Sequence, residues 1–169
     1  MKVKTKQELR EKKRRIAEKL AIRNLKKKTK KQFSRSKLIK EADRVFSLYI
    51  RKVRDKDKPC ITCWNHCEEY DNWHFQSRRL INTRWSEMNV AKQCCRCNKW
   101  LSWEQVVFGR RIDETWWEWT AEALEILARK ISQITDDEIL HTIQVYYSLL
   151  SHTEIDYKPK KQFLWTSND

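Results

Sequence analysis

The sequence of 169 residues carries a net charge of +14 and contains one glycine and two prolines. This length allows one modest domain with an arm but excludes two full hydrophobic cores, and the scarcity of helix-breaking residues favours a mainly α-helical protein. No apolar run approaches the roughly 18 residues of a membrane span, and no signal peptide is visible, so we expect a cytoplasmic protein with no membrane partner.

The positive charge is concentrated toward the N-terminus. Residues 1–32 hold fifteen Lys and Arg against three acidic residues, whereas residues 101–169 hold seven against twelve. Such a basic segment suits a polyanion, because each Lys or Arg that meets a phosphate releases condensed counterions. We therefore interpret residues 1–33 as a basic arm that contacts nucleic acid. A solvated tail that only aids solubility is the alternative.

An amphipathic helix is predicted after this arm. Apolar residues recur at helical spacing from Leu38 to Val53, and Ser34 or Ser36 is the expected N-cap. The helix should end in the charged link before Pro59, because the residue before a proline is disfavoured in the α conformation.

All six cysteines lie within residues 60–97. Four of them form two C-x-x-C pairs, Cys60 with Cys63 and Cys94 with Cys97. Two such turns present four thiolates, which is the ligand set of a closed, tetrahedral, structural Zn²⁺ site. A disulfide framework is the competing interpretation, but nothing in the sequence indicates the oxidising compartment that it requires.

A shifted zinc shell remains open from the sequence. In that alternative Cys67, together with His66, replaces Cys63. Cys95 lies inside the second pair and is expected to be packed or exposed.

The segment between the cysteine pairs carries the candidate chemistry. A β-prone aromatic run predicts a strand that ends at or near His74, and a helix should start near the second pair. Zinc would then fasten two strands to a helix and leave His74 beside Asn98. A neutral imidazole can take a proton from water near physiological pH, and the side-chain or backbone carbonyl of Asn89 can fix its tautomer.

Two further helices are expected after the lone Gly109. The first covers residues 113–131, and a capping box of Thr135 and Glu138 starts the second. We interpret residues 113–151 as a C-terminal helical hairpin whose tryptophans pack in the core, and residues 152–169 as a tail.

The segments CITC (60–63), WHF (73–75), TRWSEMNV (83–90) and QCCRCN (93–98) resemble the NinG/Rap family of phage recombination endonucleases, a member of the HNH or ββα-metal nuclease group. The resemblance covers roughly residues 34–112. It implies a small zinc-stabilised ββα-metal core that cuts branched DNA such as Holliday junctions and displacement loops. It also implies that His74 is the general base, Asn89 its orienting partner and Asn98 the third signature position.

The sequence departs from the family at Trp73, where a small residue is usual, and at residues 100–104. Mg²⁺ or Mn²⁺ is the implied catalytic ion, with oxygen ligands. The candidate ligands are Asp71, Glu87 and Asn98.

The sequence thus supports two hypotheses. The first is a metal-dependent DNA endonuclease of the Holliday-junction resolvase type, encoded by a phage or prophage and possibly a homodimer, in which Arg78, Arg79 and Arg84 position the DNA backbone. The second is a non-catalytic, zinc-dependent DNA- or RNA-binding module whose tryptophans stack on exposed bases.

Overall fold

The computed structural model describes residues 11, 15, 19–20, 34–99, 105–155, 157–160 and 163. Contacts divide the chain into residues 1–37 and residues 38–169. Most of the predicted basic arm lies outside the described residues; within it, Glu11 and Arg15 form an ion pair one helical turn apart.

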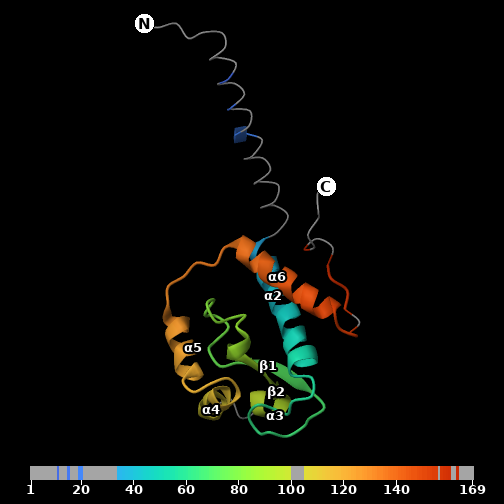
Figure 1. The fold of residues 1–169 in the computed structure, drawn as a ribbon, viewed down its shortest axis with the longest axis vertical. Helices are drawn as coiled ribbons and strands as arrows, with labels where there is room; N and C mark the ends of the chain where they lie inside the picture. Colours follow the sequence, from blue (N-terminus) through green and yellow to red (C-terminus); the bar gives the residue numbers. More distant parts are fainter. Residues whose placement is uncertain are drawn as a thin grey trace. The chain divides into compact units, whose positions relative to one another are not determined.

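The described chain is mostly helical and contains one small antiparallel sheet, as the sequence predicts (Figure 1). Its elements in chain order are α2 (Arg35–Tyr49), η1 (Ile50–Arg54), β1 (Tyr70–His74), η2 (Glu87–Asn89), β2 (Val90–Cys94), α3 (Cys95–Lys99), α4 (Gln105–Thr115), α5 (Thr120–Arg129) and α6 (Asp136–Ser151). None of the described helices is long and apolar enough to cross a membrane.

Helix α2 begins at the predicted cap. Ser34 Oγ accepts a hydrogen bond from the N–H of Lys37 at 3.4 Å, which selects Ser34 over Ser36 as the N-cap. At its other end the helix widens into the π-helical turn η1, where the N–H of Asp55 donates to the carbonyl oxygen of Ile50 at 2.9 Å.

Arg54, at the end of η1, fastens this helix to the sheet. Its guanidinium pairs with Asp55 at 2.6 Å and donates to the carbonyl oxygen of Val90 at 2.6 Å. Asp55 is 3% exposed and also accepts from the N–H of Lys92. Burial by itself raises the pKa of Asp55, but the adjacent Arg54 outweighs it and the pKa is lowered. The buried pair is therefore ionised and holds α2 and β2 together.

The sheet places His74 at the end of a strand, as predicted. Strand β1 pairs antiparallel with β2, from Tyr70 opposite Cys94 to His74 opposite Val90. Helix α3 follows β2 directly, so the order along the chain is strand, strand, helix.

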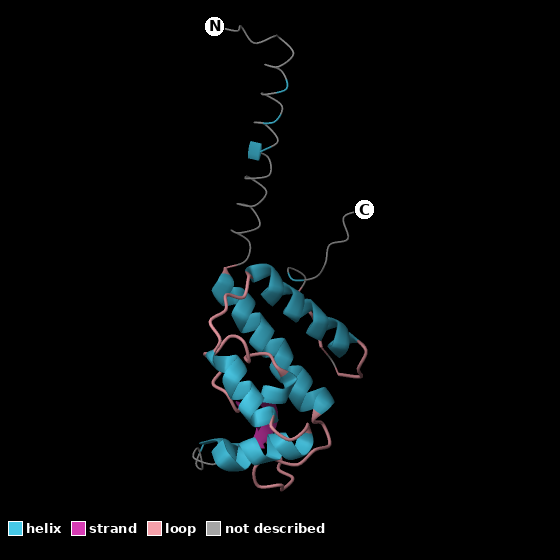
Figure 2. Ribbon diagram, turned by 60° about the vertical axis from the view of Figure 1, so that its left-hand side comes forward, coloured by secondary structure: helices cyan, strands magenta, loops and turns pink. Residues whose placement is uncertain are grey.

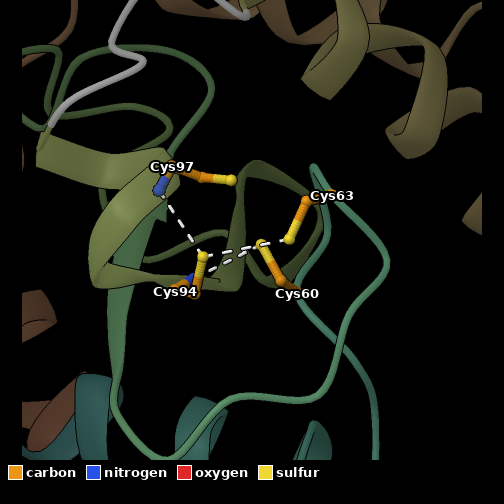
Figure 3. Close-up of side chains that lie close together, drawn as sticks. All are labelled: Cys60, Cys63, Cys94 and Cys97. Carbon is orange, nitrogen blue, oxygen red and sulfur yellow. Dashed lines mark hydrogen bonds between the residues drawn. The ribbon is translucent and has the colours of Figure 1, made fainter.

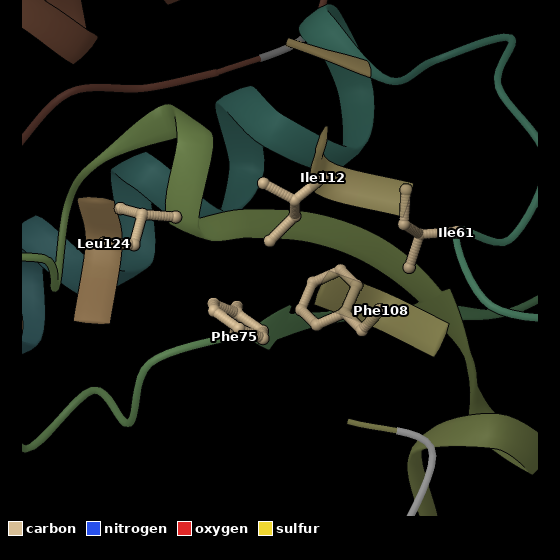
Figure 4. Close-up of a cluster of buried hydrophobic side chains, with 5 residues drawn as sticks. All are labelled: Ile61, Phe75, Phe108, Ile112 and Leu124. Atoms are coloured by element: carbon tan, nitrogen blue, oxygen red, sulfur yellow. The ribbon is translucent and has the colours of Figure 1, made fainter. Parts of the chain in front are cut away.

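A buried apolar cluster packs helices α4 and α5 against the end of strand β1 and the first cysteine pair. Its members are Ile61, Phe75, Phe108, Ile112 and Leu124 (Figure 4). Gly109 lies inside α4 and does not break the chain as expected; a Cβ at this position would lie 3.0 Å from Cε2 of Phe75. The glycine therefore permits a close approach between α4 and the residue that follows His74.

The predicted helix over residues 113–131 is wrong at its start. The chain breaks between α4 and α5, where Trp119 takes a left-handed conformation with φ 73°. Asp113 Oδ1 accepts the N–H of Ala121 at 2.8 Å and so caps α5 from the preceding helix. No glycine or proline marks this break in the sequence.

The last two helices do not form the expected hairpin. The capping box of Thr135 and Glu138 is confirmed. However, α5 packs against α4, whereas α6 lies beside α2 (Figures 1 and 2). The rings of Phe46 and Tyr146 have centroids 5.0 Å apart. Helix α6 therefore completes a core with α2 instead of closing on its neighbour in sequence.

A buried ionic network stabilises the α2–α6 contact. Glu41 is 1% exposed and accepts hydrogen bonds from Tyr147 at 2.7 Å and Lys160 at 2.5 Å, and it also pairs with Arg44. Although burial raises its pKa, these partners outweigh burial and lower the pKa of Glu41 to about 2.

Candidate zinc and active site

The four cysteines of the two C-x-x-C pairs come together. Their sulfur atoms all lie within 4.8 Å of one another (Figure 3). A tetrahedral ion with Zn–S bonds of about 2.3 Å holds its sulfurs roughly 3.8 Å apart, and Sγ of Cys63 lies 3.9 Å from Sγ of Cys94. The four residues are positioned to hold a metal ion and fit a structural zinc.

Backbone amides support these thiolates. The N–H of Cys94 points to Sγ of Cys60 at 3.3 Å, and the N–H of Cys97 points to Sγ of Cys94 at 3.5 Å. Burial raises the pKa of Cys94, but hydrogen bonds from Cys97 and the neighbouring thiols outweigh it and lower the pKa to about 7. Burial raises the pKa of Cys60 and of Cys97, so Cys94 is the one of these three thiols that is prepared to lose its proton, and the thiolate is the form that binds metal.

The alternative zinc shell is not the one formed. Cys67 is exposed, and its Sγ lies 3.8 Å from the carbonyl oxygen of Asn65, outside the group of four. His66 is exposed as well. Cys95 is partly exposed, with its Sγ 3.8 Å from a carboxylate oxygen of Asp71.

A cavity of about 770 Å³ runs along β1. Residues 71–75 form one wall, and residues of α2, the loop after β1, α3 and α4 form the others. The polar side chains that line it include those of Asp43, Arg51, Asp71, His74, Arg78, Asn98 and Gln105. The structure thus brings together, in one cavity, His74 and two of the candidate metal ligands.

His74 is held in a defined tautomer. Its Nε2 lies 3.0 Å from the backbone carbonyl oxygen of Arg84, and because a carbonyl can only accept, Nε2 carries the proton and Nδ1 is the basic nitrogen. Burial lowers the pKa of His74, and the opposing effects of the Arg84 carbonyl and Asp43 do not restore it. The imidazole is therefore neutral at physiological pH.

Asp71 and Asn98 meet on the cavity wall. Nδ2 of Asn98 donates to Oδ2 of Asp71 at 2.8 Å. Next to them, Asn72 has both side-chain polar atoms buried and without a hydrogen-bond partner in the described part of the chain. Glu87 lies elsewhere: Tyr146 donates to its carboxylate at 3.3 Å, and it does not line the cavity. Of the three candidate ligands, Asp71 and Asn98 share the cavity with His74.

Asn89 acts on the backbone instead of the imidazole. It is fully buried; its Nδ2 donates to the carbonyl oxygens of Gln76 at 3.0 Å and Thr83 at 2.9 Å, and its Oδ1 accepts from the N–H of Gln76 at 2.6 Å. We expected Asn89 to orient His74 directly, but the carbonyl of Arg84 makes that contact. Asn89 instead closes the loop that carries Arg84.

The three arginines differ in their availability. The guanidinium of Arg84 forms a two-pronged ion pair with Asp43, at 2.8 and 2.6 Å, so it is engaged within the protein. Arg78 lines the cavity and Arg79 is exposed. Residues 100–104, where the sequence departs from the expected family pattern, lie outside the described residues.

Comparison with known proteins identifies the family of this chain. A family model described as "Bacteriophage Lambda NinG protein" matches residues 1–154. The chain belongs to the NinG family. The "Protein ninG" of Escherichia phage lambda and that of Salmonella phage P22 are each 36% identical to it over 67 residues, which cover 38% of this chain and 32% of each relative. The chain thus matches about a third of the length of these relatives. No solved structure matches.

Asp43 is a residue of this NinG site that the sequence interpretation missed. It lines the cavity, holds Arg84 and accepts from Nε1 of Trp85 at 3.0 Å. Its only sequence signal is its place among the polar residues of an amphipathic helix, 41 residues before its partner. A pairing over that separation cannot be recognised from spacing.

Proposed function

We propose that this NinG family member is a metal-dependent endonuclease that hydrolyses phosphodiester bonds in branched DNA, with His74 as the general base. The observation that carries the proposal is the neutral His74, whose Nε2 is fixed on the Arg84 carbonyl while the ring lines a polar cavity of about 770 Å³. A neutral imidazole with one free nitrogen can take a proton from an attacking water molecule.

The oxygen atoms of Asp71 and Asn98 fit a hard divalent ion, Mg²⁺ or Mn²⁺. Asn98 now turns its amide nitrogen toward Asp71; rotating the amide by half a turn would present its oxygen instead. When bound, the ion would offset the negative charge that builds up on the phosphate.

The cysteine cluster and Asn89 hold the backbone that positions His74. In this proposal the strand–strand–helix unit is an HNH-like core pinned by zinc at Cys60, Cys63, Cys94 and Cys97. Asn89 shapes the loop whose carbonyl fixes the imidazole. Hence Asn89 is a positioning residue, and the zinc is structural.

Arg78 and Arg79 would hold DNA phosphates beside the cavity, because neither forms an ion pair within the described part of the chain as Arg84 does with Asp43. Arg51 also lines the cavity and adds a positive charge to it. Four-way junctions have approximate two-fold symmetry, so paired nicks would favour a homodimer.

The test is a cleavage assay on a synthetic four-way junction with Mg²⁺ or Mn²⁺. We expect His74→Ala to lower the single-turnover rate by roughly 100-fold or more while junction affinity and zinc content stay unchanged. His141→Ala is the matched control, because His141 is exposed on α6. A wild-type protein that binds the junction but never cuts it with either ion would overturn the proposal and favour the non-catalytic binding module.

A further inference from the structure

The structure holds a second cleft, on the β2 side of the sheet. It has a volume of about 260 Å³ and shares no lining residue with the cavity of His74. Its walls include residues 90–92 of β2, and two tryptophans, Trp64 and Trp116, face it. Binding sites for drug-sized ligands span about 300–1,000 Å³, so this smaller cleft suits one planar group.

The tryptophans of this cleft are open to solvent, and the expectation that the tryptophans of residues 113–151 pack in the core is wrong. Trp64 is 55% exposed and Trp116 is 37% exposed, and Trp117, which contacts Trp116 edge to face, is 57% exposed. Large aromatic side chains normally bury their surface on folding. Exposed indoles at a cleft therefore indicate a surface that is covered by a ligand.

Trp64 also sits in a strained backbone conformation. It follows the first cysteine pair with φ 59°, a left-handed conformation that glycine adopts without cost and that bulky residues rarely adopt. Its N–H is held by the carbonyl oxygen of Cys60 at 2.9 Å. The zinc turn thus holds an indole where a glycine would be easier, which points to a role for the ring itself.

The charges around the cleft suit a phosphate. The guanidinium carbon of Arg111 lies 4.8 Å from the centre of the Trp64 ring, and the partly exposed guanidinium also pairs with Glu114 at 2.6 Å. Lys58 lines the cleft with a half-exposed side chain that pairs with Asp55 at 3.1 Å. A phosphate could replace the carboxylate partner of either group, because both pairs reach the solvent. The acidic group in the lining is Asp55, which is buried and paired with both Arg54 and Lys58, so these three residues together carry a net positive charge. Aromatic faces next to accessible positive charge are the elements with which proteins bind unpaired nucleotides.

We propose that this cleft receives an unpaired base of the DNA substrate, stacked on Trp64 and Trp116, with its phosphate near Lys58 and Arg111. The inference rests on the proposed function, in that the ligand is branched DNA. Strand ends and openings at a branch expose unpaired bases, which a perfect duplex does not. The cleft would therefore select for branched structure while His74 acts on a phosphate bound in the separate cavity.

The first experiment compares two glycine variants of the full-length protein. Trp119 is the matched control for Trp64, because it is also exposed and left-handed, at φ 73°, but does not line the cleft. Glycine accepts both backbone conformations, so both variants should fold, and zinc content and thermal unfolding check this. The probes are a fluorescein-labelled thymidine oligonucleotide and a duplex of the same length, with Ca²⁺ replacing Mg²⁺.

We expect Trp64→Gly to weaken binding of the single strand by about tenfold or more and to leave duplex binding within about twofold of wild type, while Trp119→Gly changes neither. Equal weakening by both variants, equal loss on both probes, or no loss with Trp64→Gly would overturn the cleft. If the cleft passes this test but the protein never cuts DNA, the cleft proposal stands and only the endonuclease proposal fails. If Trp64→Gly binds the single strand as wild type does and the protein cuts DNA, only the cleft proposal fails.

A second experiment needs no variant. The wild-type protein is irradiated with an oligonucleotide that contains 5-iodo-2′-deoxyuridine, and the crosslinked residue is identified by mass spectrometry. An adduct on Trp64 or Trp116 supports the cleft. Adducts confined to other residues overturn it.

Discussion

Nε2 of His74 lies 3.0 Å from the backbone carbonyl oxygen of Arg84, and the side chain of the same Arg84 is clamped by Asp43 of α2. The imidazole is therefore oriented by main chain, and that main chain is fixed in turn by helix α2, which lies outside the segment that carries the four clustered cysteines. This relationship determines which nitrogen is basic and how the site should respond to pH.

Cleavage should depend on pH through His74. Burial lowers the pKa of His74 from 6.5, and only the neutral ring accepts a proton, so the rate should rise with pH and reach half of its maximum below pH 6.5. Single-turnover rates from about pH 5 to about pH 8, across the range in which histidine titrates, would show this. A rate that keeps rising well above pH 7 would mean that another group is the base.

Loss of one zinc ligand should unfold the core. Cys60→Ser removes a sulfur from the group of four, and because a structural zinc contributes its binding energy to folding, we expect the free energy of unfolding to fall by roughly 3 kcal/mol or more. Zinc content by mass spectrometry and thermal unfolding measure the effect. Cys95→Ser, outside the group, should keep one zinc. Full zinc content in both variants would contradict the assignment.

Glu41 should make the free energy of unfolding depend on pH in the acidic range. Its pKa is about 2 in the folded protein against 4.5 as the ordinary value, so its stabilisation is present above about pH 4.5 and is lost as the pH falls from there toward about 2. Glu41→Gln should cost roughly 2–4 kcal/mol near neutral pH, because Lys160 and Arg44 lose their buried partner.

Urea unfolding at several pH values tests the Glu41 prediction. The variant should show a flatter dependence on pH than wild type between about 4.5 and 2, the ordinary and the lowered value. Glu125→Gln is the control: its ion pair with Arg129 is exposed and should contribute less than about 1 kcal/mol. Parallel curves for wild type and Glu41→Gln would show that Glu41 is not the group that titrates.

Substitution of Asn89 should mainly lower stability, whereas substitution of Asn98 should mainly lower cleavage activity. Asn89→Ala removes three hydrogen bonds between a buried side chain and the segment of residues 76–83, so the free energy of unfolding should fall by roughly 2–4 kcal/mol. Asn98→Ala should change stability by less than about 1 kcal/mol but reduce Mg²⁺-dependent cleavage. Chemical denaturation and the junction assay read the two effects. If Asn98→Ala lost stability and Asn89→Ala lost only cleavage, the roles assigned to these two residues would be wrong.

Local signals in the sequence predicted much of the fold. The spacing of Cys60, Cys63, Cys94 and Cys97 identified the metal cluster, the aromatic run placed the end of a strand at His74, and Thr135 with Glu138 marked the start of α6. Each of these signals is complete within a few residues or rests on a specific ligand spacing, so it can be recognised without the fold.

The features that the sequence did not reveal depend on distant partners. Asp43 pairs with Arg84 across 41 positions, and the left-handed turn at Trp119 is held by Asp113 of the preceding helix and occurs without a glycine. The packing of α6 on α2 likewise follows from Glu41 and Tyr147, which lie 106 positions apart. Such pairings become visible only when the chain is folded.

The position of Gly109 links helix packing to the proposed chemistry. The sole glycine of the chain serves as a spacer, and its missing side chain sets how deeply α4 settles against Phe75, the residue next to His74. One added methyl group would have to move that ring, since its carbon would lie only 3.0 Å from Cε2 of Phe75. The alignment of the imidazole would thus respond to a change of a single carbon atom in the middle of helix α4.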